Sequence, residues 1–169
     1  EHLYVKGSEL DEDEVEIIKG ALQLSEKRVH SIMTPIRQVY WVAWDDVIDS
    51  RKLNDIKAHG WSRIPVFNKQ RTVCYGVLHV KDLLDIDFNG GVKVQDLPFY
   101  PTEIVGSMMA LDTLFRRFIT GGVHLIPVEK NDHIVGIVTI EDLLEEIVGH
   151  EIEDETDRRR RKTPVRKKK

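Results

Sequence analysis

The sequence predicts an α+β fold of two half-domains, each with the element order β-α-β-β-α, related by a pseudo-twofold axis and preceded by an acidic helix. Two repeated patterns carry this prediction. The segment GVLHVKDLL at 76–84 returns as GIVTIEDLL at 136–144, so a strand runs twice into an Asp-Leu-Leu helix start. An Ile-Pro-Val strand start also occurs twice, at 64–66 and 126–128. One such unit can hardly bury its apolar face alone, so we expect the two copies to pack against each other.

This repeat divides the chain into four predicted segments. They are a connector helix at 1–28, a first repeat at 29–92, a second repeat at 93–152, and a charged tail at 153–169 that we expect to be disordered. In the connector, SELDEDEVEIIKGALQL (8–24) predicts an acidic amphipathic helix, with Ser8 and Asp11 at capping-box spacing. Its apolar stripe is formed by Val15, Ile18 and Leu22.

The elements of the first repeat follow in order along the chain. A proline-flanked extended segment, MTPIRQVYWV (33–42), leads in, and a helical pattern around LNDIKAH (53–59) ends at Gly60. The strand at Ile64 turns through the polar NKQR sequence into the strand VCYGVLHV, after which Asp82 starts the second helix.

The second repeat has the same order, with a hairpin turn that is shorter by two residues. Its lead-in is LPFYPTEIV (97–105), and the helical pattern LDTLFRRFIT (111–120) ends at two glycines. The strands IPV and IVGIVTI then lead to a helix that starts near Asp142. Apolar residues lie on one side of this helix at helical spacing: Ile140, Leu143, Leu144, Ile147 and Val148.

Composition and charge exclude several classes of protein. No apolar run approaches the ~18 residues that span a bilayer, so we expect a soluble segment. Cys74 is the single cysteine, which excludes a disulfide framework and favours a reducing compartment. Nine basic and no acidic residues lie in 158–169, which leaves 16 basic and 29 acidic residues, a net charge of −13, for 1–157. An acidic body is a poor nucleic-acid binder, because phosphate affinity comes mainly from lysine and arginine.

Taken together, the motifs resemble a tandem CBS-domain pair (a Bateman module), and more closely the cytosolic part of CorC/HlyC and CNNM magnesium-transport proteins. The resemblance extends roughly over 8–157. It is carried by MTP (33–35), SRIPV (62–66), HVKDLL (79–84) and VTIEDLLEEIVG (138–149). The family's transmembrane domain and its additional C-terminal domain are not in this sequence. The resemblance therefore implies a regulatory part on the cytoplasmic face of a membrane transport protein, and not transport by this segment itself.

The resemblance further implies that a cleft between the repeats binds an adenosine nucleotide, ATP with Mg²⁺ or AMP. Thr139 suits phosphate or ribose oxygens, and Asp142 can accept from ribose hydroxyls at a helix N-terminus that favours anions. Arg63 would supply a forked cationic donor for the phosphates. Ile64 and Pro65 would give adenine an apolar wall and backbone contacts. The expected nucleotide contacts are Thr34, Ser62, Arg63, Ile64, Pro65, Thr139 and Asp142.

The second cleft is expected to be degenerate or empty. His79 stands where the other copy has a threonine, and Leu125 stands where the other copy has Arg63. An imidazole lacks the rotating donor and acceptor of a hydroxyl. The residues assigned to this degenerate cleft are His79, Asp82, His124 and Leu125.

Other interpretations remain open at this point. Thr139 and Asp142 also have the spacing of a capping box, which needs no ligand. The module would then be a structural dimerisation unit; we expect a homodimer of CBS pairs in either case. The stretch DIDFNGGVKVQD (85–96) follows the EF-hand pattern, but Pro98 and a final Asp disfavour calcium. No zinc-ligand spacing or nucleophile motif is present, so we expect neither a metal site nor an enzyme.

Overall fold

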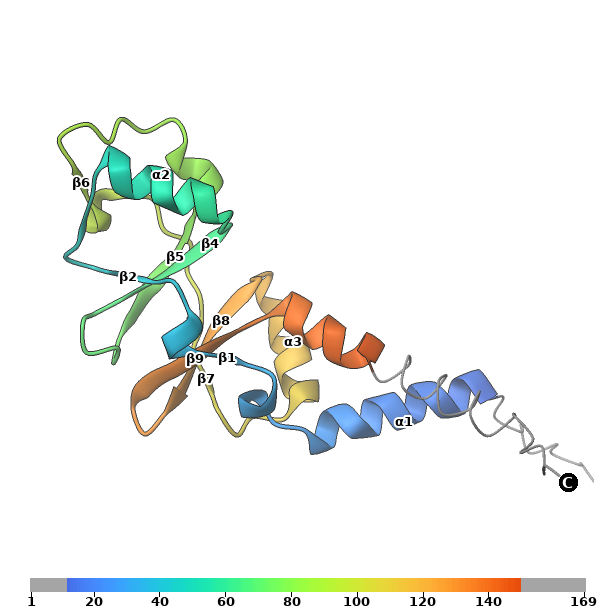
Figure 1. The fold of residues 1–169 in the computed structure, drawn as a ribbon. Helices are drawn as coiled ribbons and strands as arrows, with labels where there is room; N and C mark the ends of the chain where they lie inside the picture. Colours follow the sequence, from blue (N-terminus) through green and yellow to red (C-terminus); the bar gives the residue numbers. More distant parts are fainter. Residues whose placement is uncertain (1–11, 150–169) are drawn as a thin grey trace, which may run out of the picture.

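The structure is a computed structural model that describes residues 12–149, apart from the side chains of Glu16 and Ile17. Figure 1 shows two mixed units of helices and strands, with a helix at each end of the described chain extending to one side. The α+β class predicted from the sequence is confirmed. Among the described residues, no helix is both long and apolar enough to cross a membrane. The predicted capping pair and the charged tail lie outside the described residues: Ser8, Asp11 and 153–169.

The first unit is a three-stranded sheet in the order β2-β4-β5, with α2 lying over it (Figure 1). Asp49 caps α2 by accepting a hydrogen bond from the backbone nitrogen of Lys52, and Gly60 ends it in the left-handed conformation. A separate pair of short strands, β3 and β6, joins antiparallel. The bounds are β2 (Val42–Ala43), β3 (Val47–Ile48), α2 (Ser50–His59), β4 (Arg63–Phe67), β5 (Cys74–His79) and β6 (Val92–Lys93).

The second unit is a four-stranded sheet in the order β1-β9-β8-β7, packed against α3. Both hairpins, β4-β5 and β8-β9, shift register at equivalent places, after Val66 and after Val128. The last strand continues directly into a helix at 140–149. The bounds are β1 (Thr34–Pro35), β7 (Val105–Gly106), α3 (Leu111–Gly121), β8 (Leu125–Lys130) and β9 (His133–Thr139).

The first part of each lead-in segment pairs with the other unit. Strand β1 precedes the first unit in sequence, yet it pairs antiparallel with β9 of the second. Reciprocally, Tyr100 of the second lead-in exchanges two backbone hydrogen bonds of 2.9 Å with Val77 on β5. The sequence prediction kept each lead-in within its own repeat. This is correct for the end of each lead-in, since Val42 in β2 pairs with β4 and Val105 in β7 pairs with β8, but not for its first part. The structure differs because β5 and β9 each offer an open sheet edge to the lead-in of the other unit.

Each unit has its own apolar core. The first core is built around α2 and the β4-β5 hairpin, and the second around α3, β8 and the helix at 140–149. The tryptophans Trp44 and Trp61 pack against the first core, as expected for tryptophan in a small domain. Fully buried side chains of the first core include Ile48, Ile56, Ile64, Leu78 and Leu83. Those of the second include Leu111, Leu114, Ile126, Val138 and Leu143.

The second helix predicted for the first repeat is wrong. Asp82 lies in a short 3-10 helix, η3 (Val80–Leu83), which is followed directly by a turn and not by an α-helix. Its N-cap residue, His79, makes no side-chain capping hydrogen bond. The chain then enters a turn in which the Asp87 carboxylate accepts from the backbone nitrogen of Asn89, a local bond that competes with helix formation. The other 3-10 helices are η1 (Val29–Ser31), η2 (Ile36–Gln38) and η4 (Val94–Asp96).

The predicted connector helix is present as α1 (Glu12–Glu26). Its Leu24 packs against the second core. Two residues of the predicted apolar stripe, Ile18 and Leu22, are 46% and 57% exposed, so the described part of the chain leaves them largely uncovered. Just after the helix, the Lys27 ammonium pairs with the carboxylate of Glu146. The connector is therefore tied to the helix at 140–149.

Candidate functional site

Thr139 and Asp142 form a reciprocal capping box at the start of the helix at 140–149. The backbone nitrogen of Thr139 donates to Oδ2 of Asp142 at 3.0 Å, and the backbone nitrogen of Asp142 donates to Oγ1 of Thr139 at 3.2 Å. The capping interpretation is thus confirmed. It leaves the Thr139 hydroxyl proton and the Asp142 Oδ1 atom to interact with a ligand, so the cap does not exclude a binding role.

Thr34 lies beside this capping box. On β1 it is opposite Ile137 of β9, two residues before Thr139 on the same strand. The close approach requires Gly136, because a Cβ at that position would lie 2.5 Å from the Thr34 carbonyl oxygen. The structure therefore brings the lead-in threonine to the sheet edge from which Thr139 and Asp142 extend.

The predicted contacts at 62–65 have different environments. Ser62 is exposed, and its carbonyl accepts a hydrogen bond of 3.0 Å from the Val80 backbone. Ile64 is completely buried in the first core. Its side chain is therefore not an adenine-binding wall, which corrects that part of the prediction; only its backbone can serve. Pro65 is also buried.

Arg63 is half-buried and lies opposite His79 on the β4-β5 hairpin. Within the described part of the chain, no hydrogen bond or ion pair joins Arg63 to Thr139 or Asp142. The structure instead places Arg63 on the wall of a pocket that includes three of the four residues assigned to the degenerate cleft: His79, His124 and Leu125.

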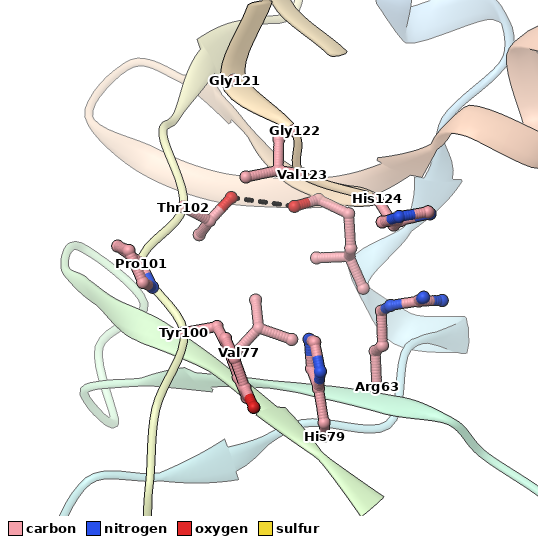
Figure 2. Close-up of a pocket in the computed structure, with 11 residues that line it drawn as sticks. Arg63, Val77, His79, Tyr100, Pro101, Thr102, Gly121, Gly122, Val123 and His124 are labelled. Atoms are coloured by element: carbon pink, nitrogen blue, oxygen red, sulfur yellow. Dashed lines mark hydrogen bonds between the residues drawn. The ribbon is translucent and has the colours of Figure 1, made fainter. Parts of the chain in front are cut away.

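This pocket has a volume of about 230 Å³ and lies between the two units (Figure 2). Its wall is formed by Arg63, Val77 and His79 of the first unit, by the lead-in at 100–102, and by residues 121–125 that connect α3 to β8. The hydroxyl of Thr102 donates a 2.8 Å hydrogen bond to the Leu125 carbonyl. That bond attaches the lead-in to β8 and holds the wall together.

The aromatic side of the pocket is a stack of His79 on Tyr100. The two ring centroids are 3.9 Å apart, with planes 13° from parallel. Burial lowers the pKa of His79, and the positive charge of Arg63 lowers it further. On the other ring, hydrogen bonding to the Asp82 carboxylate and its negative charge raise the pKa of the Tyr100 hydroxyl.

Among residues 12–149, two polar atoms of this region are buried without a hydrogen-bond partner: Nε of Arg63 and Oδ2 of Asp82. Asp82 therefore differs from Asp142, whose Oδ2 is engaged by the capping box. Buried polar groups in native proteins are nearly always paired.

Tyr100 and Thr102 were not predicted as site residues. They belong to LPFYPTEIV, whose role as a lead-in was recognised but whose pairing with β5 was not. The repeat could have indicated these two residues, because Thr34 was predicted as a site residue from the equivalent lead-in of the first repeat.

The EF-hand-like stretch at 85–96 gains no support. Among the described residues, no group of three or more histidine, cysteine, aspartate or glutamate side chains is placed to hold a metal ion. Asn89 has a partner at the start of α2, since its side-chain oxygen accepts from the Ser50 hydroxyl at 3.0 Å. The stretch connects the units.

Comparison with known proteins first defines the class. The CBS-domain family model matches residues 94–149. A solved CBS domain of a bacterial CNNM/CorC-family Mg²⁺ transporter is 32% identical, with a TM-score of 0.67 over 81% of this chain and 84% of that chain. Another structure of such a domain, in complex with ATP, is also 32% identical, with a TM-score of 0.67 over 81% of this chain and 98% of that chain. The chain belongs to the CBS domains of the CNNM/CorC family.

Curated relatives agree with this assignment. The magnesium and cobalt efflux protein CorC of Pasteurella multocida is 35% identical over 150 residues, which are 88% of this chain and 49% of the relative. Protein MAM3 of Saccharomyces cerevisiae is 33% identical over 153 residues, which are 88% of this chain and 22% of that protein. The chain thus spans about half, or less, of the curated relatives it matches.

Proposed function

We propose that this chain is the nucleotide-sensing regulatory module of a CorC/CNNM-type divalent-cation transport or efflux protein, on the cytoplasmic face of the membrane. ATP, as its Mg²⁺ complex, is the proposed ligand, and the module is proposed not to be an enzyme. The observation that carries the proposal is the ATP complex of a related CBS domain, together with the preserved Thr139 and Asp142 pair of this chain.

The proposed nucleotide site is the cleft at the strand end of β9. Asp142 would accept from the ribose hydroxyls through Oδ1, and the Thr139 hydroxyl would donate to a ribose or phosphate oxygen. The free N–H groups at the start of the helix at 140–149 favour an anion. Thr34 lies at the adjacent strand, and Arg63 would contribute charge to the phosphates. Ser62 and the backbone of Ile64 and Pro65 complete the proposed contacts.

A sensor must pass its state to the rest of the protein. The capping box starts the helix at 140–149, and Glu146 on this helix pairs with Lys27 at the end of the connector. Nucleotide bound at Asp142 would bias this helix, and through Lys27 the connector that leads to the proposed membrane domain. Such a shift requires different nucleotide affinity for two arrangements of these elements.

A structural dimerisation module is the second candidate, because the capping box already satisfies Thr139 and Asp142 without a ligand. For this candidate, Thr139→Ala would lower the free energy of unfolding by about 1 kcal/mol, with no ATP binding to lose. A third candidate is an AMP-responsive module, which a competition titration distinguishes from an ATP sensor. In that case AMP would displace bound ATP and bind more tightly than ATP.

The proposal is tested by calorimetric titration with ATP, with and without Mg²⁺, on wild type and variants. Asp142→Ala should weaken ATP about tenfold or more, since hydrogen bonds to a charged group contribute about 1.5–3 kcal/mol. Asp142→Asn can still accept from the Thr139 backbone, so it should keep the cap while losing the charged acceptor. Arg63→Ala should weaken ATP more than adenosine.

Asp82→Ala is the matched control, because Asp82 occupies the equivalent place in the other repeat. It should leave ATP affinity nearly unchanged. Loss of ATP binding in Asp82→Ala, with retention in Asp142→Ala, would assign the nucleotide to the other cleft. If the wild type does not bind ATP, the structural dimerisation module is the remaining candidate function.

A further inference from the structure

One face of α1 is exposed along most of the helix. Glu14, Ile18, Leu22 and Glu26 follow one another at intervals of four residues, which places them in one row, and all four are exposed. Two apolar side chains thus lie between two carboxylates. Leu24, which packs against the second core, points to the other side of the helix. The described chain therefore leaves the apolar part of this row, here called the α1 row, uncovered.

The negative charge of the described chain is concentrated around the α1 row. Residues 12–27 and 140–149 together hold nine acidic and two basic residues, whereas 28–139 hold 12 acidic and 13 basic residues. The two helices are joined by the ion pair of Lys27 with Glu146, and Figure 1 shows them extending to the same side of the molecule. Together they form an acidic side of the protein.

The opposite charge lies in the sequence that follows. Residues 158–169 hold nine basic residues and no acidic one. The eight residues 150–157 hold five acidic residues and no basic one, so they have no charge attraction to the two helices. This spacer can span about 30 Å from Gly149, whereas the 15 residues of α1 extend over about 22 Å. The basic segment can therefore reach all of α1.

Lysine and arginine side chains suit a helix face of this pattern. Their aliphatic stems cover apolar surface while their charged ends stay in water or beside carboxylates. Single ion pairs at a surface contribute little free energy. Because the segment and the helix belong to one chain, however, the short spacer gives a high effective concentration, so several weak contacts are enough to populate a docked state.

We propose that residues 158–169 dock on the α1 row of the same chain. The stems of their lysines and arginines cover Ile18 and Leu22, and their charged ends lie beside the surrounding carboxylates. The segment expected from the sequence to be disordered thus forms a second link, besides the ion pair of Lys27 with Glu146, between the end of the module and the connector helix. This contact goes beyond the nucleotide site and does not require it to be filled.

The test is NMR of the complete chain, without nucleotide, with a paramagnetic label in the segment. A nitroxide is attached to Thr163→Cys in a Cys74→Ser background, which keeps all nine basic residues. The backbone signals of α1 around Ile18 and Leu22 should broaden at about 0.1 M salt and much less at about 1 M, because the Debye length falls from about 10 Å to about 3 Å. The signals of α2 in the first unit should keep their intensity at both.

A mixed sample distinguishes docking within one chain from docking on a second copy. Isotope-labelled protein without a nitroxide is combined with unlabelled protein that carries one. The α1 signals should then keep their intensity, because the nitroxide is on a different chain from the observed helix.

Variants of the segment and of the apolar row identify the groups that hold the contact. Replacing the four arginines at 158–161 by glutamine should lower the ratio of docked to undocked segment about tenfold. Ile18→Ser with Leu22→Ser should also lower it, since the stems lose their apolar surface. Val73→Ser is the matched control, because Val73 is similarly exposed but lies in the β4-β5 turn, away from α1 (Figure 1).

The charge of the row is tested in the same way. Glu26→Gln keeps the size of the side chain and should reduce the broadening of the α1 signals at the lower salt concentration. Asp132→Asn is its control, since it removes an exposed carboxylate from the β8-β9 turn, which Figure 1 shows on the far side of the second unit from α1. This variant should broaden α1 as the parent protein does. Unchanged α2 signals in every variant show that the fold is kept.

Three results would overturn the proposal. The first is the absence of broadening on α1 at the lower salt concentration; sedimentation with vesicles of acidic phospholipid would then assign the segment to a lipid surface. The second is equal broadening in the mixed sample, which would place the segment on another copy. The third is unchanged broadening in both the apolar variant and Glu26→Gln, which would place it elsewhere on the chain. Failure of ATP binding alone would leave these results intact.

Discussion

Asp82 and Asp142 occupy equivalent places in the two repeats but have different partners. Asp142 accepts from the backbone of Thr139, whereas Oδ2 of Asp82 is buried without a hydrogen-bond partner. The difference begins with one side chain, since His79 replaces the capping threonine and makes no capping bond. The two aspartates therefore differ in whether they take part in a helix cap and in the chemistry that each carboxylate offers to a ligand.

Cys74 gives a prediction at the same scale. Burial raises the pKa of its thiol from 9.0 to about 11, an effect that a backbone hydrogen bond at Gly76 opposes only in part. At about pH 8 its alkylation by iodoacetamide should be at least roughly tenfold slower in native protein than in urea, because the thiolate reacts. A Cys74→Ser variant measures background labelling.

The sign of the pH effect follows from the raised pKa. The neutral thiol is favoured in the folded state, so its contribution to the free energy of unfolding is complete below pH 9 and is lost as pH rises toward about 11. Equal alkylation rates for native and unfolded protein would contradict the burial of this group.

At the scale of the elements, two glycines admit the exchanged lead-ins. Gly76 on β5 and Gly136 on β9 occupy equivalent places in the two hairpins. A Cβ at Gly76 would lie 2.7 Å from the Tyr100 carbonyl oxygen, and one at Gly136 would lie 2.5 Å from that of Thr34. Each glycine thus lets the backbone of the other unit's lead-in approach its strand.

Gly136→Ala should therefore displace β1. We expect the free energy of unfolding to fall by about 1–3 kcal/mol, as for other overpacked sites, measured by urea denaturation. ATP affinity should fall as well, since Thr34 moves with the strand. Gly20→Ala is the control, because a Cβ there meets nothing within 4 Å and Gly20 lies inside α1. It should stabilise the protein by about 0.5–1 kcal/mol. An unchanged urea midpoint for Gly136→Ala would contradict the close approach.

At the scale of the whole molecule, apolar side chains remain exposed on the surface of the single chain. Leu144 and Val148 of the helix at 140–149 are 46% and 50% exposed, and Leu84 after η3 is 52% exposed. We propose that a second copy of the chain covers them, giving a homodimer of CBS pairs in a flat disc.

Light scattering at micromolar concentration should therefore give twice the 19.6 kDa mass of the chain. Leu144→Glu with Val148→Glu should yield the monomer, because the charges would be buried unpaired in the interface. Val73→Glu is the control, since Val73 is 44% exposed in the β4-β5 turn, away from these helices. A 19.6 kDa species alone for wild type, with and without nucleotide, would rule the dimer out.

The sequence by itself determined the local structure of both repeats, apart from the helix wrongly predicted after Asp82. Helical spacing and terminal glycines predicted α2 and α3. The spacing of Thr139 and Asp142 predicted the capping box that the structure contains. These features depend on residues that are close in sequence, so their spacing is enough to predict them. The same short motifs also carried the family resemblance that the comparisons confirmed.

The tertiary structure alone decided which residues share a pocket. A strand of two residues such as β1 has too little pattern to specify its partner, and the open edge of β9 selected it. The exchange of lead-ins brought Tyr100 onto His79 and set Thr102 against Leu125. It also left Arg63 with an unpaired nitrogen beside two histidines. Contacts between residues far apart in the chain depend on which sheet edges and helix faces remain free after each unit has formed its core. The spacing of residues along the sequence does not specify these free edges and faces.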